Sequence, residues 1–150
     1  MAVPEALENQ QLTALLEILE GIGVPADSWL TEPDVLEGVP GDAVPSVATT
    51  PVVYLQHLRT DQAPAEAGTS SHYWRAHFKV WLMAKTPRIV VSLKADVLRA
   101  LFAAEDSLTT SFGQPAYADS FAHRDDMSSA GTAVGELTIY LDFEMSHTAP

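Results

Sequence analysis

The chain has 150 residues, of which 47% are hydrophobic, and its formal net charge is -12 at pH 7. That length allows one sizeable hydrophobic core but not two ordinary domains. The negative charge disfavours binding to nucleic-acid phosphates, and it disfavours a basic surface that would bind a membrane. The chain contains no cysteine, which excludes disulfides, thiolate metal sites and cysteine nucleophiles.

The charges are distributed unevenly along the chain. Nine acids and no Lys or Arg precede Arg59, eight basic and six acidic residues lie from Arg59 to Arg124, and five acids follow. An acidic patch on one copy could therefore meet a mildly basic patch on another copy. The same negative charge is also expected of a soluble protein whose molecules repel one another and so do not aggregate.

The N-terminal part predicts one helix and a long loop. The first eight residues lack the basic region of a signal peptide, and no apolar run approaches the roughly 20 residues that span a bilayer, so we expect a soluble, unexported protein. Residues 4–21 have leucines at helical spacing, with Gly21 and Gly23 ending the helix. Five prolines between 25 and 51 exclude a central strand, so residues 24–51 are predicted to form a surface loop.

The next two strands are predicted to be joined by a long hairpin loop over residues 61–71, rich in Ala, Gly, Ser and Thr. Residues 52–58 form the first of these strands. Residues 71–84 form the second and alternate strictly, because one face carries Trp74, Ala76, Phe78, Val80 and Leu82 and the other carries Arg75, His77 and Lys79. Trp81 and Met83 share the basic face and are expected to form an anchor for a partner.

A second helix is predicted after Pro87, with a broad face packed on the sheet. Val90, Leu93, Val97, Leu101 and Ala104 form its central stripe, which Val91, Leu98 and Phe102 are expected to widen. Residues 114–122 are predicted to form the third strand, and the polar residues 123–131 its turn.

The last strand, residues 135–145, alternates apolar residues with Glu136, Asp142 and Glu144. If it lies antiparallel to residues 71–84, Arg75, His77 and Lys79 face Asp142, Glu144 and Glu136 on the polar side of one sheet. The predicted fold is a single α+β domain over residues 1–150, in the order α-β-β-α-β-β. Its mostly antiparallel sheet has about four strands and two helices on one face.

This order of elements resembles the tail terminator (tail completion) family of long-tailed bacteriophages and phage-tail-like particles. The similarity extends from about Leu12 to His147 and includes the strand PVVYL at 51–55, the helix SLKADVLRALFAAED at 92–106 and the strand GELTIYLDFEMSH at 135–147. The length of segment 24–51 departs from the family's pattern. The resemblance implies a hexameric ring in the neck of the virion that caps the tail tube, ends its polymerisation and joins the head connector. It implies no cofactor or metal.

The expected partners of such a ring are other copies of the chain, the tail-tube protein and a connector or neck protein. The expected location is the virion tail or neck, after assembly in the host cytoplasm, with DNA passing through an acidic lumen without specific binding. The residues predicted to contact neighbouring subunits or partners are Arg59, Trp81, Met83, Arg88, Arg99 and Arg124.

Other functions fit the same sequence. Another neck or head-tail joining protein would also form an acidic ring, and a small-molecule-binding α+β domain would use the sheet as a pocket. Acid-base catalysis requires a base and carboxylates close together, and one short run supplies them: His123, Arg124, Asp125 and Asp126. A turn explains the same residues, because polar side chains are favoured where they can hydrogen-bond the backbone of a turn. Gly21-Ile22-Gly23-Val24 lacks the third glycine and the preceding strand of a dinucleotide site. The sequence favours a protein that is not an enzyme.

Overall fold

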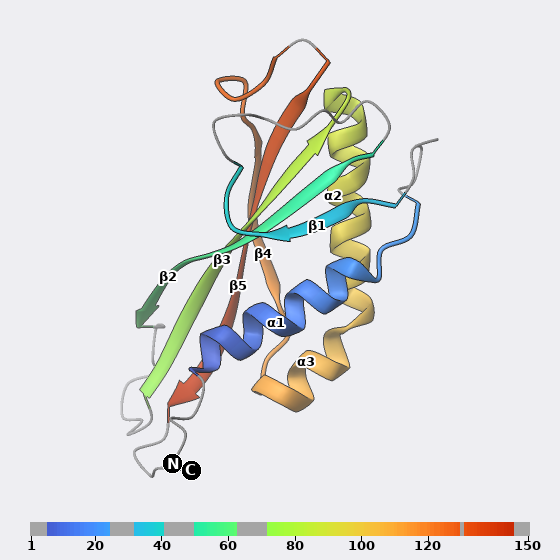
Figure 1. The fold of residues 1–150 in the computed structure, drawn as a ribbon. Coiled ribbons are helices and arrows are strands. Elements are labelled where there is room, and N and C mark those ends of the chain that lie inside the picture. Colours follow the sequence, from blue (N-terminus) through green and yellow to red (C-terminus); the bar gives the residue numbers. More distant parts are fainter. Residues whose placement is uncertain (1–5, 25–31, 41–49, 63–71, 130, 146–150) are drawn as a thin grey trace, which may run out of the picture.

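The structure is a computed structural model that describes residues 6–24, 32–40, 50–62, 72–129 and 131–145. The described helices are α1 (Leu7–Glu20), α2 (Pro87–Ala103) and α3 (Glu105–Phe112). The described strands are β1 (Asp34–Glu37), β2 (Val52–Gln62), β3 (His72–Ala84), β4 (Tyr117–His123) and β5 (Ala133–Met145). Figure 1 shows long, twisted strands with the helices beside them.

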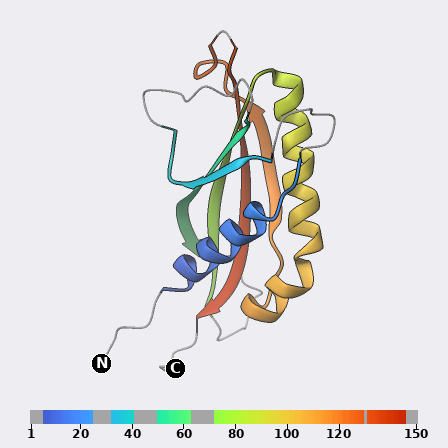
Figure 2. The same cartoon turned by 45° about the vertical axis from the view of Figure 1, so that its right-hand side comes forward.

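The strands form one five-stranded sheet in the order β1-β2-β3-β5-β4. All neighbouring strands are antiparallel except β1, which runs parallel to β2. The helices lie on one side of this sheet, as the rotated view in Figure 2 shows. The predicted α+β class, with a mostly antiparallel sheet covered by helices on one face, is confirmed.

The predicted pairing of β3 with β5 is also confirmed. The two strands are antiparallel along their whole lengths, and Arg75 lies directly opposite Asp142. Ala76, Phe78, Val80 and Leu82 are fully buried on the helix side of β3, as the alternation requires. The polar and charged side chains of both strands therefore lie together on the face that the helices leave uncovered.

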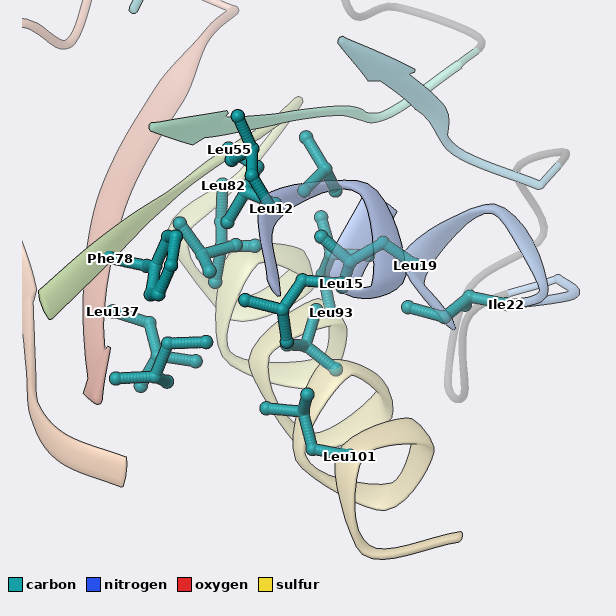
Figure 3. Close-up of a cluster of buried hydrophobic side chains, with 14 of the residues drawn as sticks. Leu12, Leu15, Leu19, Ile22, Leu55, Phe78, Leu82, Leu93, Leu101 and Leu137 are labelled. Atoms are coloured by element: carbon teal, nitrogen blue, oxygen red, sulfur yellow. The ribbon is translucent and has the colours of Figure 1, made fainter. Parts of the chain in front are cut away.

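The main core lies between the helices and the sheet (Figure 3). Leu12, Leu15 and Leu19 recur at helical spacing on α1 and are buried against the sheet. The leucines and other apolar residues that Figure 3 labels around them are Ile22, Leu55, Phe78, Leu82, Leu93, Leu101 and Leu137. Since burial of one such side chain contributes roughly 1.5–3 kcal/mol, this layer supplies most of the stabilisation that holds the helices on the sheet.

Local sequence signals explain where the helices begin and end. Thr86 precedes α2, and its hydroxyl accepts a hydrogen bond from the backbone N–H of Ile89 at 3.2 Å. Pro87 follows at the first helical position, where a missing N–H costs nothing. Gly113 ends α3 with a φ of 86°, a left-handed conformation that glycine adopts without strain.

Three boundaries differ from the predictions. Segment 24–51 was expected to be a loop, but it contains the edge strand β1. The second helix ends at Ala103, and α3 follows as a separate helix. Strand β2 continues through Asp61 and Gln62, which were assigned to the hairpin loop. Residues 25–31, 41–49 and 63–71, which carry most of both predicted loops, lie outside the described residues.

The outer side of α2 also differs from its prediction. Val91 and Phe102 were expected to widen the core stripe, but their exposed fractions are 40% and 70%. Leu98 packs only partly against the core. The buried stripe of α2 is therefore narrower than predicted, and the helix has a second apolar surface that faces away from the sheet.

Candidate subunit interface

The uncovered face of the sheet carries a ladder of paired charges. The Arg75 guanidinium donates two hydrogen bonds to the Asp142 carboxylate, from Nε to Oδ1 at 2.7 Å and from Nη2 to Oδ2 at 3.0 Å. The same guanidinium lies 4.1 Å from the centre of the Tyr140 ring, which stacks on Tyr117 of β4. This bidentate pair links β3 to β5 and confirms the predicted partner of Arg75.

His77 has a different partner from the one predicted. It lies opposite Tyr140 on β5, and its Nε2 is 3.2 Å from Asp61 Oδ2 on β2. Glu144 instead lies opposite Tyr73, so the predicted pairing of His77 with Glu144 is wrong. Burial of the imidazole, together with the nearby positive charge of Arg59, lowers the pKa of His77 below its ordinary value of 6.5. Its buried Nδ1 has no hydrogen-bond partner among the described residues.

Arg124 is the centre of a charge network at the other end of this face. Its guanidinium donates hydrogen bonds to both Asp126 carboxylate oxygens, at 2.9 and 2.7 Å, and to Glu136 Oε2 at 2.9 Å. Lys79 Nζ lies 3.1 Å from the same Glu136 oxygen, as predicted for Lys79. Burial opposes ionisation of Glu136, but the hydrogen bonds from Lys79 and Arg124 outweigh burial and lower the pKa of Glu136.

Trp81 and Met83 are buried within the subunit, with exposed fractions of 7% and 0%. Together with Val52 and Val134 they form a second apolar cluster, against which Tyr54 and Met127 pack. The Trp81 ring also has Lys79 Nζ at 4.9 Å and Arg124 Cζ at 5.4 Å from its centre. Both side chains are therefore largely buried within one subunit, and the expectation that they form an anchor for a partner stays a prediction.

The four predicted interface arginines differ in their surroundings. Arg59 Nε lies 2.8 Å from Asp61, Arg99 pairs with Asp96 at 2.6 Å, and Arg124 is held by its network. Arg88 is exposed and makes no ion pair with any described residue. Their role between subunits stays a prediction, and Arg88 is the arginine whose charge is left for a partner.

The exposed apolar side chains of α2 and of β1 were not predicted as site residues. Val91 and Phe102 are exposed on α2, and Leu36 is 45% exposed on β1 beside Val39 at 50%. A signal for α2 was present in the sequence, since its apolar residues cover more of the helix circumference than one packed face needs. No comparable signal marks β1, which has four residues.

The turn that was considered as a catalytic cluster is occupied by structural contacts. Asp126 binds Arg124, and the His123 ring packs edge-on against Phe121 with 5.2 Å between ring centres. Across the described ranges, no group of three His, Asp or Glu side chains is placed to hold a metal ion. No described helix is long and apolar enough to cross a membrane.

Comparisons with known proteins include a distant likeness to a solved structure. No family model matches the chain, and no curated protein matches it. Among solved structures, the virion of a native gene transfer agent particle contains a chain that is 14% identical, with a TM-score of 0.46 and a coverage of 92% of each chain. That score and that identity do not establish a shared fold or a shared function.

Proposed function

We propose that this chain is a tail terminator of a long-tailed bacteriophage or a phage-tail-like particle. In this role it is a structural protein that forms a ring, expected to be a hexamer, on the last ring of the tail tube. The ring ends tube polymerisation and presents the surface to which the head connector attaches, and DNA passes through it. The observation that carries the proposal is the pairing of β3 with β5, the two long alternating strands in the pattern that resembles this family.

The surface of the subunit supports a role in assembly. The sheet is open, and among the described strands β1 and β4 each have one edge without a strand neighbour. Such edges are available for contacts between copies or with another ring. Paired charges and the second apolar cluster fill the uncovered sheet face, so a small-molecule pocket has less support there.

The first test is the mass of the purified chain in solution. Sedimentation across a concentration series should show a species several times heavier than the 16.2 kDa subunit, and electron microscopy should show rings. A chain that stays a monomer or a dimer would favour the small-molecule-binding alternative and contradict the proposal.

The second test separates a tail terminator from another neck protein. Purified rings are added to the tail-tube protein while it polymerises, and tube lengths are measured by electron microscopy. A tail terminator shortens the tubes and is found at one end of each. Rings that bind the head connector but leave tube length unchanged would identify another head-tail joining protein.

A further inference from the structure

The outer side of α2 carries an apolar stripe whose two ends are exposed and whose middle is partly buried. Val91, Ala95, Leu98 and Phe102 follow the spacing i, i+4, i+7 and i+11, which places all four on one side of the helix. Val91 and Phe102, at its two ends, are 40% and 70% exposed. We call these four residues the α2 stripe. An exposed apolar surface that extends along one side of a helix, rather than a single exposed residue, is typical of a contact surface.

Positive charge flanks the N-terminal end of the α2 stripe, whereas the two carboxylates that begin α3 are exposed beyond its C-terminal end. Lys85 and Arg88 are exposed at its N-terminal end and make no ion pair with any described residue. Arg99 lies beside the stripe with 64% of its side chain exposed, although it also pairs with Asp96. In a chain with a net charge of -12, this combination fits a partner that is both apolar and acidic.

Residues 32–39, which contain β1, have that composition. Three carboxylates, of Glu32, Asp34 and Glu37, are exposed there together with Leu36 and Val39. No Lys or Arg precedes Arg59, so no basic residue interrupts this surface along the sequence. We call residues 32–39 the β1 segment. It lies at one edge of the sheet, and its outer edge has no described strand beside it.

The two surfaces belong to separate parts of one subunit. Helix α2 packs on β3 and β5, whereas β1 is separated from those strands by β2. Both surfaces are exposed in the same subunit, so they do not contact and cover each other within one copy. The exposed side of α1 is also acidic, through Glu17 and Glu20, but it has no large exposed apolar residue, which makes it the poorer match for the stripe.

We propose that the β1 segment of one copy docks on the α2 stripe of the next copy. Leu36 and Val39 would cover Val91 and Phe102, and the carboxylates of the segment would neutralise Arg88 and Lys85. The contact is heterologous, because two different surfaces meet, and repetition of such a contact closes a ring when its rotation allows. The inference rests on the proposed function and specifies the contact that builds the proposed ring.

Two complementary variants test the contact. The stripe variant carries Arg88→Glu and Phe102→Ser, and the segment variant carries Leu36→Ser and Glu37→Lys. All four residues are exposed, so circular dichroism and thermal unfolding should show folded subunits. Each variant alone should need a concentration at least about tenfold higher to assemble than the unmodified chain.

Mixing the two variants gives the sharper result. The stripe variant keeps an intact β1 segment, and the segment variant keeps an intact α2 stripe. One native contact is therefore possible between them, and the mixture should form a 1:1 dimer that does not grow. Native mass spectrometry distinguishes this dimer from monomers and from rings.

A matched control carries Leu58→Ser and Glu144→Lys, the same kinds of change as in the segment variant, at exposed residues of β2 and β5 outside both surfaces. It should assemble like the unmodified chain. Assembly of both test variants into normal rings would overturn the proposed contact and leave the proposed function intact. Monomers only in the mixture would also overturn the contact. An unmodified chain that never assembles would contradict the proposed function itself.

Discussion

Gly135 is the residue where a single added carbon should matter most. A Cβ at this position of β5 would lie 2.8 Å from Val90 Cγ1 on α2 and 2.9 Å from Phe121 Cε2 on β4. Real Cβ atoms do not approach so closely, so α2 or the ring must shift. The absence of a side chain at Gly135 therefore allows α2 to lie close to the sheet.

We predict that Gly135→Ala lowers the free energy of unfolding by about 1–3 kcal/mol, because overpacking a closed core forces such shifts. Urea denaturation measures the change. Gly23→Ala is the matched control, since an added Cβ there meets nothing within 4 Å, and it should change stability by less than about 0.5 kcal/mol. Equal effects of the two substitutions would show that the contact at Gly135 is unimportant.

Gln11 is a polar residue in the middle of the α1 core face. Its side chain is fully buried, and neither Nε2 nor Oε1 has a hydrogen-bond partner among the described residues. An unpaired buried amide costs roughly 1–3 kcal/mol. We predict that Gln11→Met, which keeps the length of the side chain, raises the midpoint of urea denaturation. A lower midpoint would mean that the amide has a partner that stabilises the subunit.

His77 should make stability depend on pH. Because burial and Arg59 lower its pKa in the folded subunit, the unfolded chain takes up the proton more readily. The stabilisation is therefore fully present above the unfolded value of about 6.5 and is lost as pH falls through the lowered folded pKa. Asp61 and Arg75 also act on this imidazole, in opposite directions.

We predict that His77→Gln reduces the loss of thermal stability between pH 8 and pH 5. His123→Gln changes an exposed histidine in the same way and should leave the loss as it is in the unmodified chain. An unchanged pH profile of His77→Gln would rule out His77 as its source. The carboxylates with lowered pKa, Asp61, Asp126 and Glu136, act at lower pH and are outside this window.

At the scale of the elements, alternation was the most informative signal. It predicted the β3–β5 pair because a one-residue slip would expose every core residue of either strand. It also predicted the partners of Arg75 and Lys79. Alternation could not predict β1, because a strand of four residues between prolines is too short to show a periodic pattern. The parallel pairing of β1 with β2, which begins at Val52, also had no signal in the sequence.

The charge network around Arg124 could not be predicted from the sequence, for a different reason. Arg124 meets Glu136 because the turn after β4 returns the chain to β5, where the Arg124 N–H donates to the Val134 carbonyl at 2.8 Å. That return depends on the conformation of the whole turn. The same turn brings Met127 onto the second apolar cluster, which contains Trp81, and no pattern in the sequence indicated this contact.

The Arg75–Asp142 pair tests whether the paired charges on the uncovered sheet face add stability or only fix the register of β3 against β5. Its side chains are 29% and 23% exposed, and its two hydrogen bonds are well formed. A double-mutant cycle with Arg75→Met and Asp142→Asn should give a coupling energy of about 0.5–1 kcal/mol, within the range for cross-strand pairs. A coupling near zero would mean that the pair only fixes the register.

At the scale of the whole molecule, charge has two opposing effects. The chain has a net charge of -12, so its carboxylates repel one another within the compact subunit. The proposed contact between copies instead brings acidic and basic surfaces together. Salt screens both interactions, over about 8 Å at physiological ionic strength. It should therefore stabilise the subunit and weaken the ring at the same time.

We predict that raising the salt from low to physiological concentration increases the melting temperature of the monomeric stripe variant. Over the same range, the unmodified chain should need a higher concentration to assemble, because the charges of Arg88 and its carboxylate partners are screened. Thermal unfolding of the variant and sedimentation of the unmodified chain measure the two responses separately. Rings that survive molar salt would show that the apolar contact of Phe102 and Val91 holds the copies together without the charges. In that case Phe102→Ser alone should separate the rings, whereas Arg88→Glu alone should not.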